Sequence, residues 1–345
     1  MKKEDIMNSS EKEFYFQWHF LNKCNLRCKH CYQEGYEAIE FPLEKLKEVA
    51  NQLIIALDKW DMYGRISITG GEPFTSKQIY PLLEYLDGKE RIKSLNILTN
   101  GTLITDKDIK KLKAIKKLYE IQISLDGDCE EVHDAVRGAG AFQKALNGIK
   151  KLKENGFRVA IMYTVMPNNK DGVIGAIDLA EKENVDAMTV ERVTPCGHGS
   201  NMTDLQSEDI KEIFYRVTER AKKIKNNLKI RRSRPLWVNT LHLESNEEKK
   251  ESIGGFCPVG LTAMAILWDG TVLPCRRLEI PIGNILKDGI FKIWYGSELL
   301  WNIRDKNKLK GKCNGCNNMA RCGGCRAVAY AMTGDYMESD TQCWK

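Results

Sequence analysis

The stretch Leu21-Asn-Lys-Cys24-Asn-Leu-Arg-Cys28-Lys-His-Cys31-Tyr32 carries three cysteines in a C-x3-C-x2-C spacing. It follows an apolar stretch, residues 14–21, that is typical of a strand. Three thiolates on one short loop suit three corners of a [4Fe–4S] cube, whereas an all-cysteine site has four ligands. The fourth iron would then be open to a small molecule. Because a structural zinc site uses a closed set of four ligands, the spacing favours an iron–sulfur cluster.

Beyond this loop the chain alternates between strand and helix patterns as far as residue 193. Apolar periodicity predicts strands at 14–21, 65–69, 94–98, 120–125, 158–165 and 187–193, and helices at 43–60, 76–86, 106–116, 141–155 and 172–183. Six such units in sequence favour parallel strands joined by right-handed crossovers. Because a complete barrel has eight units, we predict an α/β fold built on a partial, TIM-like (β/α)6 barrel.

The composition and the apolar pattern of the chain change after the sixth predicted strand, and these changes predict three parts. We expect the barrel over residues 1–203, a polar helical bridge over 204–250, and a small cysteine-rich domain over 251–345. In the last part, short apolar pieces alternate with Gly, Pro and Cys. Such a sequence suggests a domain held together by metal rather than by a large core.

The 345-residue chain has twelve cysteines, and their distribution is uneven. No apolar run approaches the roughly 18–20 residues that span a bilayer, and the charged N-terminus lacks a signal-peptide core. We therefore expect a cytoplasmic protein with no membrane contact, in which disulfides are rare. Besides the first three, seven cysteines gather near the C-terminus: Cys257, Cys275, Cys313, Cys316, Cys322, Cys325 and Cys343. The two left over, Cys129 and Cys196, are expected to be small buried hydrophobes; a thiol that faces the substrate is the alternative for Cys196, which follows the sixth predicted strand.

The net charge of +6 has a local origin in residues 222–234, which hold seven basic and no acidic residues. A solvated helix end leading into a loop is the first interpretation. A docking strip for an acidic partner is the alternative. No aromatic residues are interleaved with the charges, so we expect no nucleic-acid partner.

The cysteine loop, together with Thr69-Gly70-Gly71-Glu72-Pro73 after the second predicted strand, resembles the radical S-adenosylmethionine (radical SAM) superfamily. The resemblance implies that SAM binds the open iron and that the reduced cluster cleaves it to methionine and a 5′-deoxyadenosyl radical. It further implies that Gly70, Gly71 and Glu72 hold the amino group of SAM. Each predicted strand ends in an unusual polar segment, and functional groups of such barrels lie at these ends.

Three further residues are candidates for binding SAM through the same resemblance. Ser124 ends the fourth predicted strand, and Arg137 belongs to a following H-D-x-x-R-G segment; related enzymes use such residues for the carboxylate and ribose of SAM. An Arg fork matches the two oxygens of a carboxylate. Tyr32, directly after Cys31, is the third candidate.

The C-terminal cysteines resemble the SPASM extension of radical SAM maturases, which holds two auxiliary [4Fe–4S] clusters. By this resemblance the first would be bound by Cys257, Cys275 and Cys325, and the second by Cys313, Cys316, Cys322 and Cys343. The chain departs from the family pattern once, with C-x2-C in place of C-x3-C at Cys322 and Cys325. The first set has three cysteines, which leaves either an open iron or another ligand. Zinc-ribbon-like binding is the alternative.

The resemblance implies a net oxidation, with electrons supplied by a flavodoxin or ferredoxin. Modification of a ribosomally synthesised peptide by cross-linking, thioether formation or decarboxylation is the first expectation. A separate peptide-recognition protein is expected with it, because 23 residues precede Cys24. Oxidative decarboxylation of tetrapyrrole propionates, as in haem synthesis, is the alternative, with Arg276 and Arg277 serving the carboxylates. A sulfatase-maturing enzyme is disfavoured because Arg276 follows Cys275 where that group has an acidic base, and a non-catalytic electron carrier is disfavoured by the intact motifs.

Overall fold

The computed structural model describes residues 12–36, 40–245 and 253–345, and the described strands form one sheet in the order β10-β9-β8-β1-β2-β3-β4-β5-β6-β7. Its centre is a run of parallel neighbours in chain order. They are β1 (Glu13–His19), β2 (Tyr63–Thr69), β3 (Ile92–Thr99), β4 (Leu118–Ser124), β5 (Val159–Val165) and β6 (Ala187–Arg192). The six predicted strands and their parallel arrangement are confirmed.

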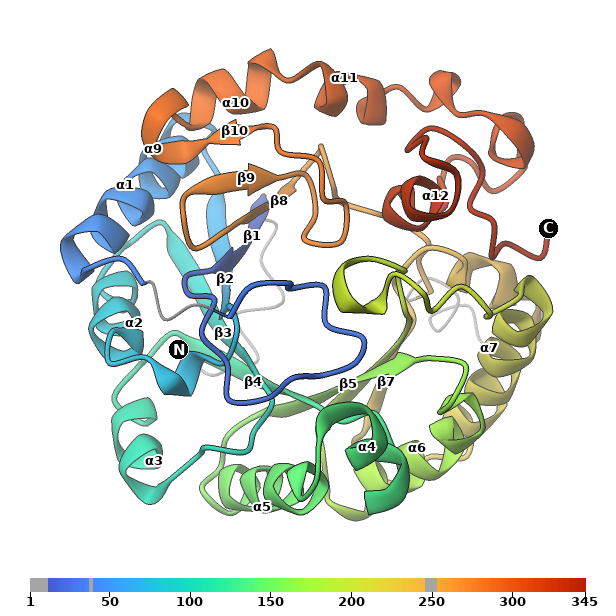
Figure 1. Ribbon diagram of the computed structural model, residues 1–345, viewed down its shortest axis with the longest axis horizontal. Helices are drawn as coiled ribbons and strands as arrows, with labels where there is room; N and C mark the ends of the chain where they lie inside the picture. The colour runs from blue at the N-terminus through green and yellow to red at the C-terminus, as the bar shows by residue number, and fades with distance from the viewer. Residues whose placement is uncertain (1–11, 37–39, 246–252) are drawn as a thin grey trace.

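Helices line the outside of the curved sheet (Figure 1). They are α1 (Leu43–Lys59), α2 (Ile79–Asp87), α3 (Asp106–Leu112), α5 (Ala141–Glu154), α6 (Val173–Lys182) and α7 (Ser207–Ala221). Helix α1 shows why: Leu46, Val49, Leu53 and Leu57 recur at three- and four-residue spacings and are all buried. The five predicted helices are present. Between the first and sixth strands α4 (Glu130–Arg137) was not predicted, because five of the eight residues of EEVHDAVR are polar and the helix is short.

The sheet extends past both ends of the six-stranded run. Strand β7 (Lys229–Arg231) pairs parallel with β6, and β8 (Ala263–Ile266) pairs parallel with β1. Strands β9 (Thr271–Leu273) and β10 (Gly283–Asn284) then continue antiparallel. The segment expected to be a helical bridge is therefore mixed: α7 is followed by β7 and by a 3-10 helix over Trp237–Leu243.

The basic residues 222–234 are divided between surface and interior. Lys222 and Lys223 lie exposed just after α7. Arg231 forms an ion pair with Glu120, and the buried Arg232 donates to Glu244 at 2.5 Å. Three of the seven basic residues, Arg231, Arg232 and Arg234, are thus paired with carboxylates of the fold, so a docking strip over the full length of the segment is not what the structure shows.

The C-terminal part packs against the barrel through apolar contacts. Its helices are α9 (Ile285–Asp288), α10 (Ile290–Gly296), α11 (Glu298–Arg304) and α12 (Arg326–Thr333). Trp294 of α10 lies 5.0 Å from Phe14 of β1 and 5.6 Å from Trp60, measured between ring centroids. The main apolar core therefore continues into this part, although little regular structure surrounds its cysteines.

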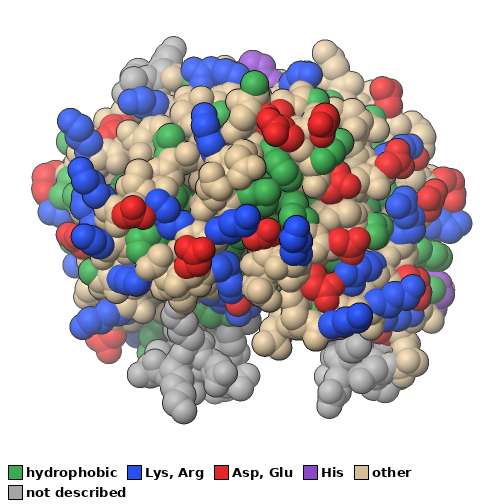
Figure 2. Space-filling model, turned by 90° about the horizontal axis from the view of Figure 1, so that it is seen from below, with side chains coloured by type: hydrophobic (Ala, Val, Ile, Leu, Met, Phe, Trp, Pro, Cys, Tyr) green, Lys and Arg blue, Asp and Glu red, His purple; other side chains and the backbone are tan. Residues whose placement is uncertain are grey.

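Two features of the described residues concern contact with a membrane and with nucleic acid. None of the helices in the described residues is long and apolar enough to cross a membrane. On the face shown in Figure 2, the described basic and acidic side chains are interspersed. That face does not present the basic stripe that is typical of nucleic-acid binding.

Candidate active site

The cysteine loop is fastened to the GGEP turn by close backbone contacts. The amide of Gly71 donates to the carbonyl of Leu21 at 3.0 Å, and the amide of Glu72 donates to the carbonyl of Lys23 at 2.8 Å. A Cβ on Gly70 would lie 2.3 Å from the Leu21 oxygen, and one on Gly71 would lie 2.1 Å from the Lys23 oxygen. The two glycines were expected to let a ligand approach. The structure shows that the chain itself already requires them.

The loop after β6 fastens the other side of the cysteine loop. The amide of His198 donates to the carbonyl of Cys31 at 2.8 Å. A Cβ on Gly197, which has a φ of +54°, would lie 2.6 Å from the carbonyl carbon of Tyr32. The cysteine loop crosses the barrel in Figure 1 and is held between the ends of β2 and β6.

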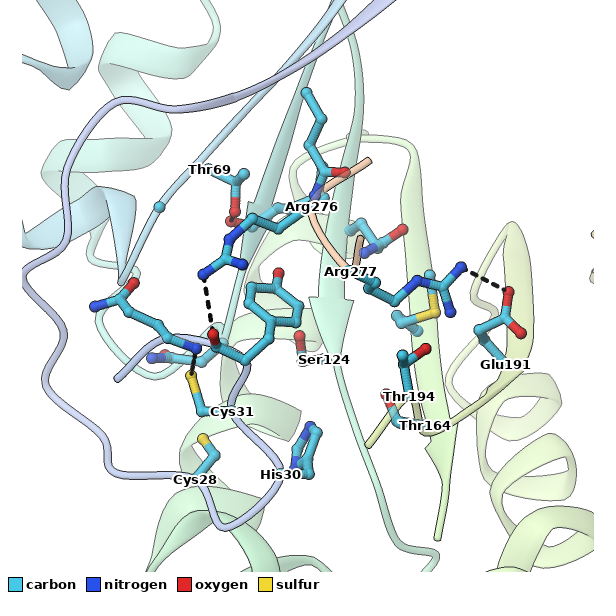
Figure 3. Close-up of a pocket in the computed structure, with 18 of the residues that line it drawn as sticks. Cys28, His30, Cys31, Thr69, Ser124, Thr164, Glu191, Thr194, Arg276 and Arg277 are labelled. Atoms are coloured by element: carbon cyan, nitrogen blue, oxygen red, sulfur yellow. Dashed lines mark hydrogen bonds and ion pairs between the residues drawn. The ribbon is translucent and has the colours of Figure 1, made fainter. Parts of the chain in front are cut away.

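One pocket at the ends of the parallel strands brings most of the predicted site together (Figure 3). Its lining includes nearly all the candidates for the first cluster and for SAM: Cys24, Cys28, Cys31, Tyr32, Gly70, Gly71, Ser124 and Arg137. Cys275 also lines it, so one of the cysteines predicted to bind an auxiliary cluster reaches the same space. Glu72 is not among the lining residues.

Glu72 is fully buried and is engaged by the chain itself. Its carboxylate accepts from Thr99 Oγ1 at 2.7 Å, the Asn100 amide at 2.8 Å and the Phe74 amide at 3.1 Å. Burial raises the pKa of Glu72 to about 7, against the opposing effect of these donors. The structure thus shows a carboxylate that ties the GGEP turn to the end of β3, while its predicted role toward the amino group of SAM stays a prediction.

The Glu72 carboxyl should make the stability of the ligand-free chain depend on pH. The unfolded chain loses this proton near pH 4.5 and the native chain near pH 7. The contribution of Glu72 to stability should therefore fall by about 3 kcal/mol as the pH rises through this window and then level off. It is read as the difference between the wild-type chain and Glu72→Gln, because burial lowers the pKa of His30 and His133, which contribute with the opposite sign. Urea unfolding across pH 4.5–8 measures the effect, and Glu72→Gln should remove it. An unchanged pH slope in the variant would refute this assignment.

Arg137 also differs from expectation in its contacts. Its Nε donates to Asp126 Oδ2 at 2.7 Å, and its Nη1 donates to Cys28 Sγ at 3.6 Å. Burial alone would raise the pKa of Asp126, but Arg137 and then His30 hold it below its usual range. The guanidinium predicted to bind the carboxylate of SAM thus also contacts a buried aspartate and the thiol of Cys28, a predicted cluster ligand.

Several polar atoms facing the pocket have no partner within the described chain. They belong to four lining residues, which are His30 (Nδ1), Tyr36 (OH), Thr194 (Oγ1) and Arg276 (Nε). Buried polar atoms without partners are uncommon in native proteins and require an explanation. A polar ligand in this pocket is such an explanation, and the thiols beside it are the donors that an iron–sulfur cluster requires.

Some of the C-terminal cysteines neighbour one another: Cys257 lies near Cys275 and Cys325, and Cys343 near Cys313. Burial raises the pKa of Cys257 to about 12, and the neighbouring thiols of Cys275 and Cys325 add to the effect. Cys313 likewise adds to the raised pKa of Cys343, after burial and Asp340. Backbone amides donate to the other two sulfurs, Asn318 to Cys316 at 3.4 Å and Gly324 to Cys322 at 3.3 Å. In the described part of the chain, no three Cys, His, Asp or Glu side chains are arranged to hold a single metal ion.

A buried ion pair that the sequence did not reveal joins the barrel to the cysteine-rich end. Arg192 at the end of β6 forms a two-armed contact with Asp340, and its Nη1 also donates to Gln342 at 2.9 Å. Asp340 in turn accepts from the amide of Cys325 at 2.7 Å. Since Cys343 follows three residues later, this pair holds segments that carry candidate ligands of both auxiliary clusters.

Three arginines and one glutamate line the pocket together, and we call them the arginine wall: Arg234, Arg276, Arg277 and Glu191. Arg277 Nη2 lies 3.5 Å from Glu191 Oε2, and Arg234 Nε lies 3.9 Å from the same oxygen. Arg276 is paired with Glu279 at 2.6 Å, donates to the Tyr32 carbonyl at 3.0 Å and stacks on the Tyr32 ring at 4.4 Å. Of the described residues that line the pocket, Glu191 is the one carboxylate. Through its carbonyl and its ring, Tyr32 contacts Arg276 of the arginine wall.

The two remaining cysteines are less buried than expected. Both Cys129 and Cys196 are part-exposed. Cys129 directly precedes α4, at the surface. Burial of its thiol raises the pKa of Cys196 to about 12, and Glu279 adds to the rise. Neither residue lines the pocket.

Comparison with known proteins identifies the family. A model of the radical SAM superfamily matches residues 18–180, and a model of the SPASM iron–sulfur cluster-binding domain matches residues 257–317. The AdoMet-dependent heme synthase of Methanosarcina barkeri is 30% identical over 345 aligned residues, which cover 94% of this chain and 95% of that protein. Mycofactocin maturase MftC of Mycolicibacterium smegmatis is 28% identical, over 91% of this chain and 78% of that protein.

Among solved structures, Streptococcus suis SuiB bound to its precursor peptide SuiA superposes with a TM-score of 0.76 at 19% identity, over 97% of this chain and 76% of that chain. At this identity the likeness concerns the fold. Together with the pocket, these findings establish the class of enzyme. The chain belongs to the radical SAM superfamily and carries its C-terminal SPASM iron–sulfur cluster-binding domain.

Proposed function

We propose that this enzyme oxidatively decarboxylates a substrate that presents carboxylates to the arginine wall, and that the propionate side chains of a tetrapyrrole fit best. The observation that carries the proposal is the wall itself. Arg234, Arg276 and Arg277 face the pocket, while Glu191 is the single lining carboxylate among the described residues. Arginine is suited to carboxylates because its fork matches two oxygens.

Cys24, Cys28 and Cys31 would hold the cluster to which SAM binds, beside Gly70, Gly71, Ser124 and Arg137. When bound, SAM and the reduced cluster supply the radical that removes a hydrogen atom from the substrate. Cys257, Cys275 and Cys325 would hold the first auxiliary cluster, and Cys313, Cys316, Cys322 and Cys343 the second. Since Cys275 and the arginine wall share the pocket, the first auxiliary cluster would lie beside the substrate and accept its electron.

Loss of CO2 requires no base from the protein, which fits a pocket whose one lining carboxylate among the described residues, Glu191, is paired with Arg277. A propionate that gives up one hydrogen atom and one electron becomes a vinyl group and CO2, with no proton for the protein to accept. Thioether formation, in contrast, releases a thiol proton.

Peptide modification, the first expectation from the sequence, is the second candidate. The similarity to a mycofactocin maturase favours it. A peptide with a C-terminal carboxylate would meet the same arginines and lose CO2 in the same way. We propose an external flavodoxin- or ferredoxin-type donor for either substrate, and a separate recognition protein for a peptide.

The decisive experiment supplies Fe-coproporphyrin III and SAM to the reconstituted, dithionite-reduced chain. One CO2 for each 5′-deoxyadenosine is the expected result. Product from carboxylate-ended peptides with none from the porphyrin would select the second candidate. Formation of 5′-deoxyadenosine without CO2 from either substrate class would overturn decarboxylation.

Removing Arg277 should weaken substrate binding rather than SAM cleavage. Arg277→Gln deletes a charge-assisted hydrogen bond worth about 1.5–3 kcal/mol, so the KM for substrate should rise by about tenfold or more. Steady-state kinetics measures this, with Arg216→Gln on the exposed face of α7 as the matched control. An unchanged KM in Arg277→Gln would place the substrate carboxylate elsewhere.

A further inference from the structure

Arg137 lies between a buried carboxylate and a cysteine of the first cluster. Its Nε donates to Asp126 Oδ2 at 2.7 Å, its Nη1 donates to Cys28 Sγ at 3.6 Å, and its Nη2 lies 3.5 Å from His30 Nε2. Arg137 is 8% exposed and Asp126 is fully buried. One nitrogen of the guanidinium therefore donates to the carboxylate of Asp126, while another donates to the thiol of Cys28. Cys28 and His30 are labelled in Figure 3.

Asp126 is fixed mainly by the barrel, and from the cysteine loop His30 Nε2 lies 3.5 Å from its Oδ2. Its Oδ1 accepts from the amide of Thr164 at 2.8 Å, and its backbone carbonyl accepts from Asn169 Nδ2 at 3.0 Å. Its own amide donates to His133 Nδ1 at 3.1 Å. Since these donors and acceptors come from β5, the loop after it and α4, Asp126 aims Arg137 at Cys28 from a rigid frame.

We propose that Arg137, aimed by Asp126, tunes the reduction potential of the cluster on Cys24, Cys28 and Cys31 by donating a hydrogen bond to the sulfur of Cys28. The inference rests on the proposed cluster assignment but not on the identity of the substrate. Hydrogen bonds to the sulfurs and nearby charge set the potentials of such clusters. Reduction adds one negative charge, so a cationic donor favours the reduced cluster, and the carboxylate of Asp126 opposes it.

This arrangement predicts shifts of opposite sign. Arg137→Met removes the cation and the donor, and the cluster should become harder to reduce. Asp126→Asn removes the negative charge but keeps the shape and one acceptor, and the cluster should become easier to reduce. A residue that only supports the fold would not give opposite shifts in these two variants.

The test is an EPR-monitored redox titration of the full reconstituted chain without SAM. The signal of the first cluster is identified as the one lost from a chain in which Cys24, Cys28 and Cys31 are all alanine. We expect at least a tenfold change in the ratio of reduced to oxidised cluster at fixed potential, or 59 mV for one electron, downward for Arg137→Met and upward for Asp126→Asn. Arg231→Met is the matched control, because Arg231 pairs with the buried Glu120 near the opposite end of β4, and it should leave the potential unchanged.

Several outcomes would overturn the inference. Shifts of the same sign in both variants, or no shift in either, would show that the contact does not set the potential. Loss of the first cluster from both variants, with Arg231→Met fully loaded, would show that the ion pair is only structural. Absence of the first-cluster signal from the wild-type chain would overturn the proposed function together with this inference.

Discussion

Replacing Cys24, Cys28 and Cys31 together by alanine should abolish 5′-deoxyadenosine formation. The three thiols lie on one loop that is fastened on both sides by the GGEP turn and by the loop after β6. Without thiolate ligands the cluster has no attachment, and without the cluster the bound SAM cannot be reduced. The measurement is 5′-deoxyadenosine released after dithionite reduction, and its loss should be complete.

The matched control for this variant is Cys129→Ala, which removes a part-exposed thiol outside the pocket. It should retain full cleavage. Cys313→Ala should also cleave SAM, uncoupled from product, because it affects a set of thiols remote in sequence from the first loop. Residual 5′-deoxyadenosine in the triple variant at the wild-type rate would mean that the radical arises at another cluster.

Replacing Asp340 by alanine should cause a large loss of stability. Arg192 is 1% exposed and Asp340 is fully buried, so the variant leaves a cation in the core with Gln342 as its remaining partner. Breaking a buried pair by removing one partner costs about 3–5 kcal/mol. The amide of Cys325 loses its acceptor as well. Chemical unfolding of the reconstituted chain measures the loss, and iron content should fall with it.

Asp335→Ala is the matched control for Asp340→Ala. Asp335 pairs with Lys310 at 2.6 Å in the same C-terminal segment, but both side chains are exposed. Exposed pairs contribute about 0–1 kcal/mol, so this variant should be nearly neutral. If Asp340→Ala proved as mild as Asp335→Ala, the Arg192–Asp340 pair would not be what holds the C-terminal segment.

Local sequence signals predicted the parts of the site that lie on one loop or one turn. The C-x3-C-x2-C loop and the GGEP turn follow strands whose apolar periodicity is strong, so both their residues and their meeting point were foreseeable. The strands β7 and β8 were missed because, at 3 and 4 residues, they are too short to show a period. Helix α4 was missed because it is short and five of its eight residues are polar.

Contacts between distant residues had no sequence signal. Arg192 and Asp340 are 148 positions apart, and neither lies in a pattern that names its partner. Glu72 and Arg137 were located by their motifs, yet the motifs did not reveal that Thr99, Asn100 and Asp126 already engage them. Burial decides such contacts, because a charged group without water must find partners wherever the fold supplies them.

The iron content of the anaerobically purified chain, measured together with its Mössbauer spectrum, tests most directly the claim that ten of the twelve cysteines serve three clusters. Three [4Fe–4S] clusters predict about twelve irons per chain, all in cluster form. About four irons per chain, with the seven C-terminal cysteines free or bound to zinc, would contradict it.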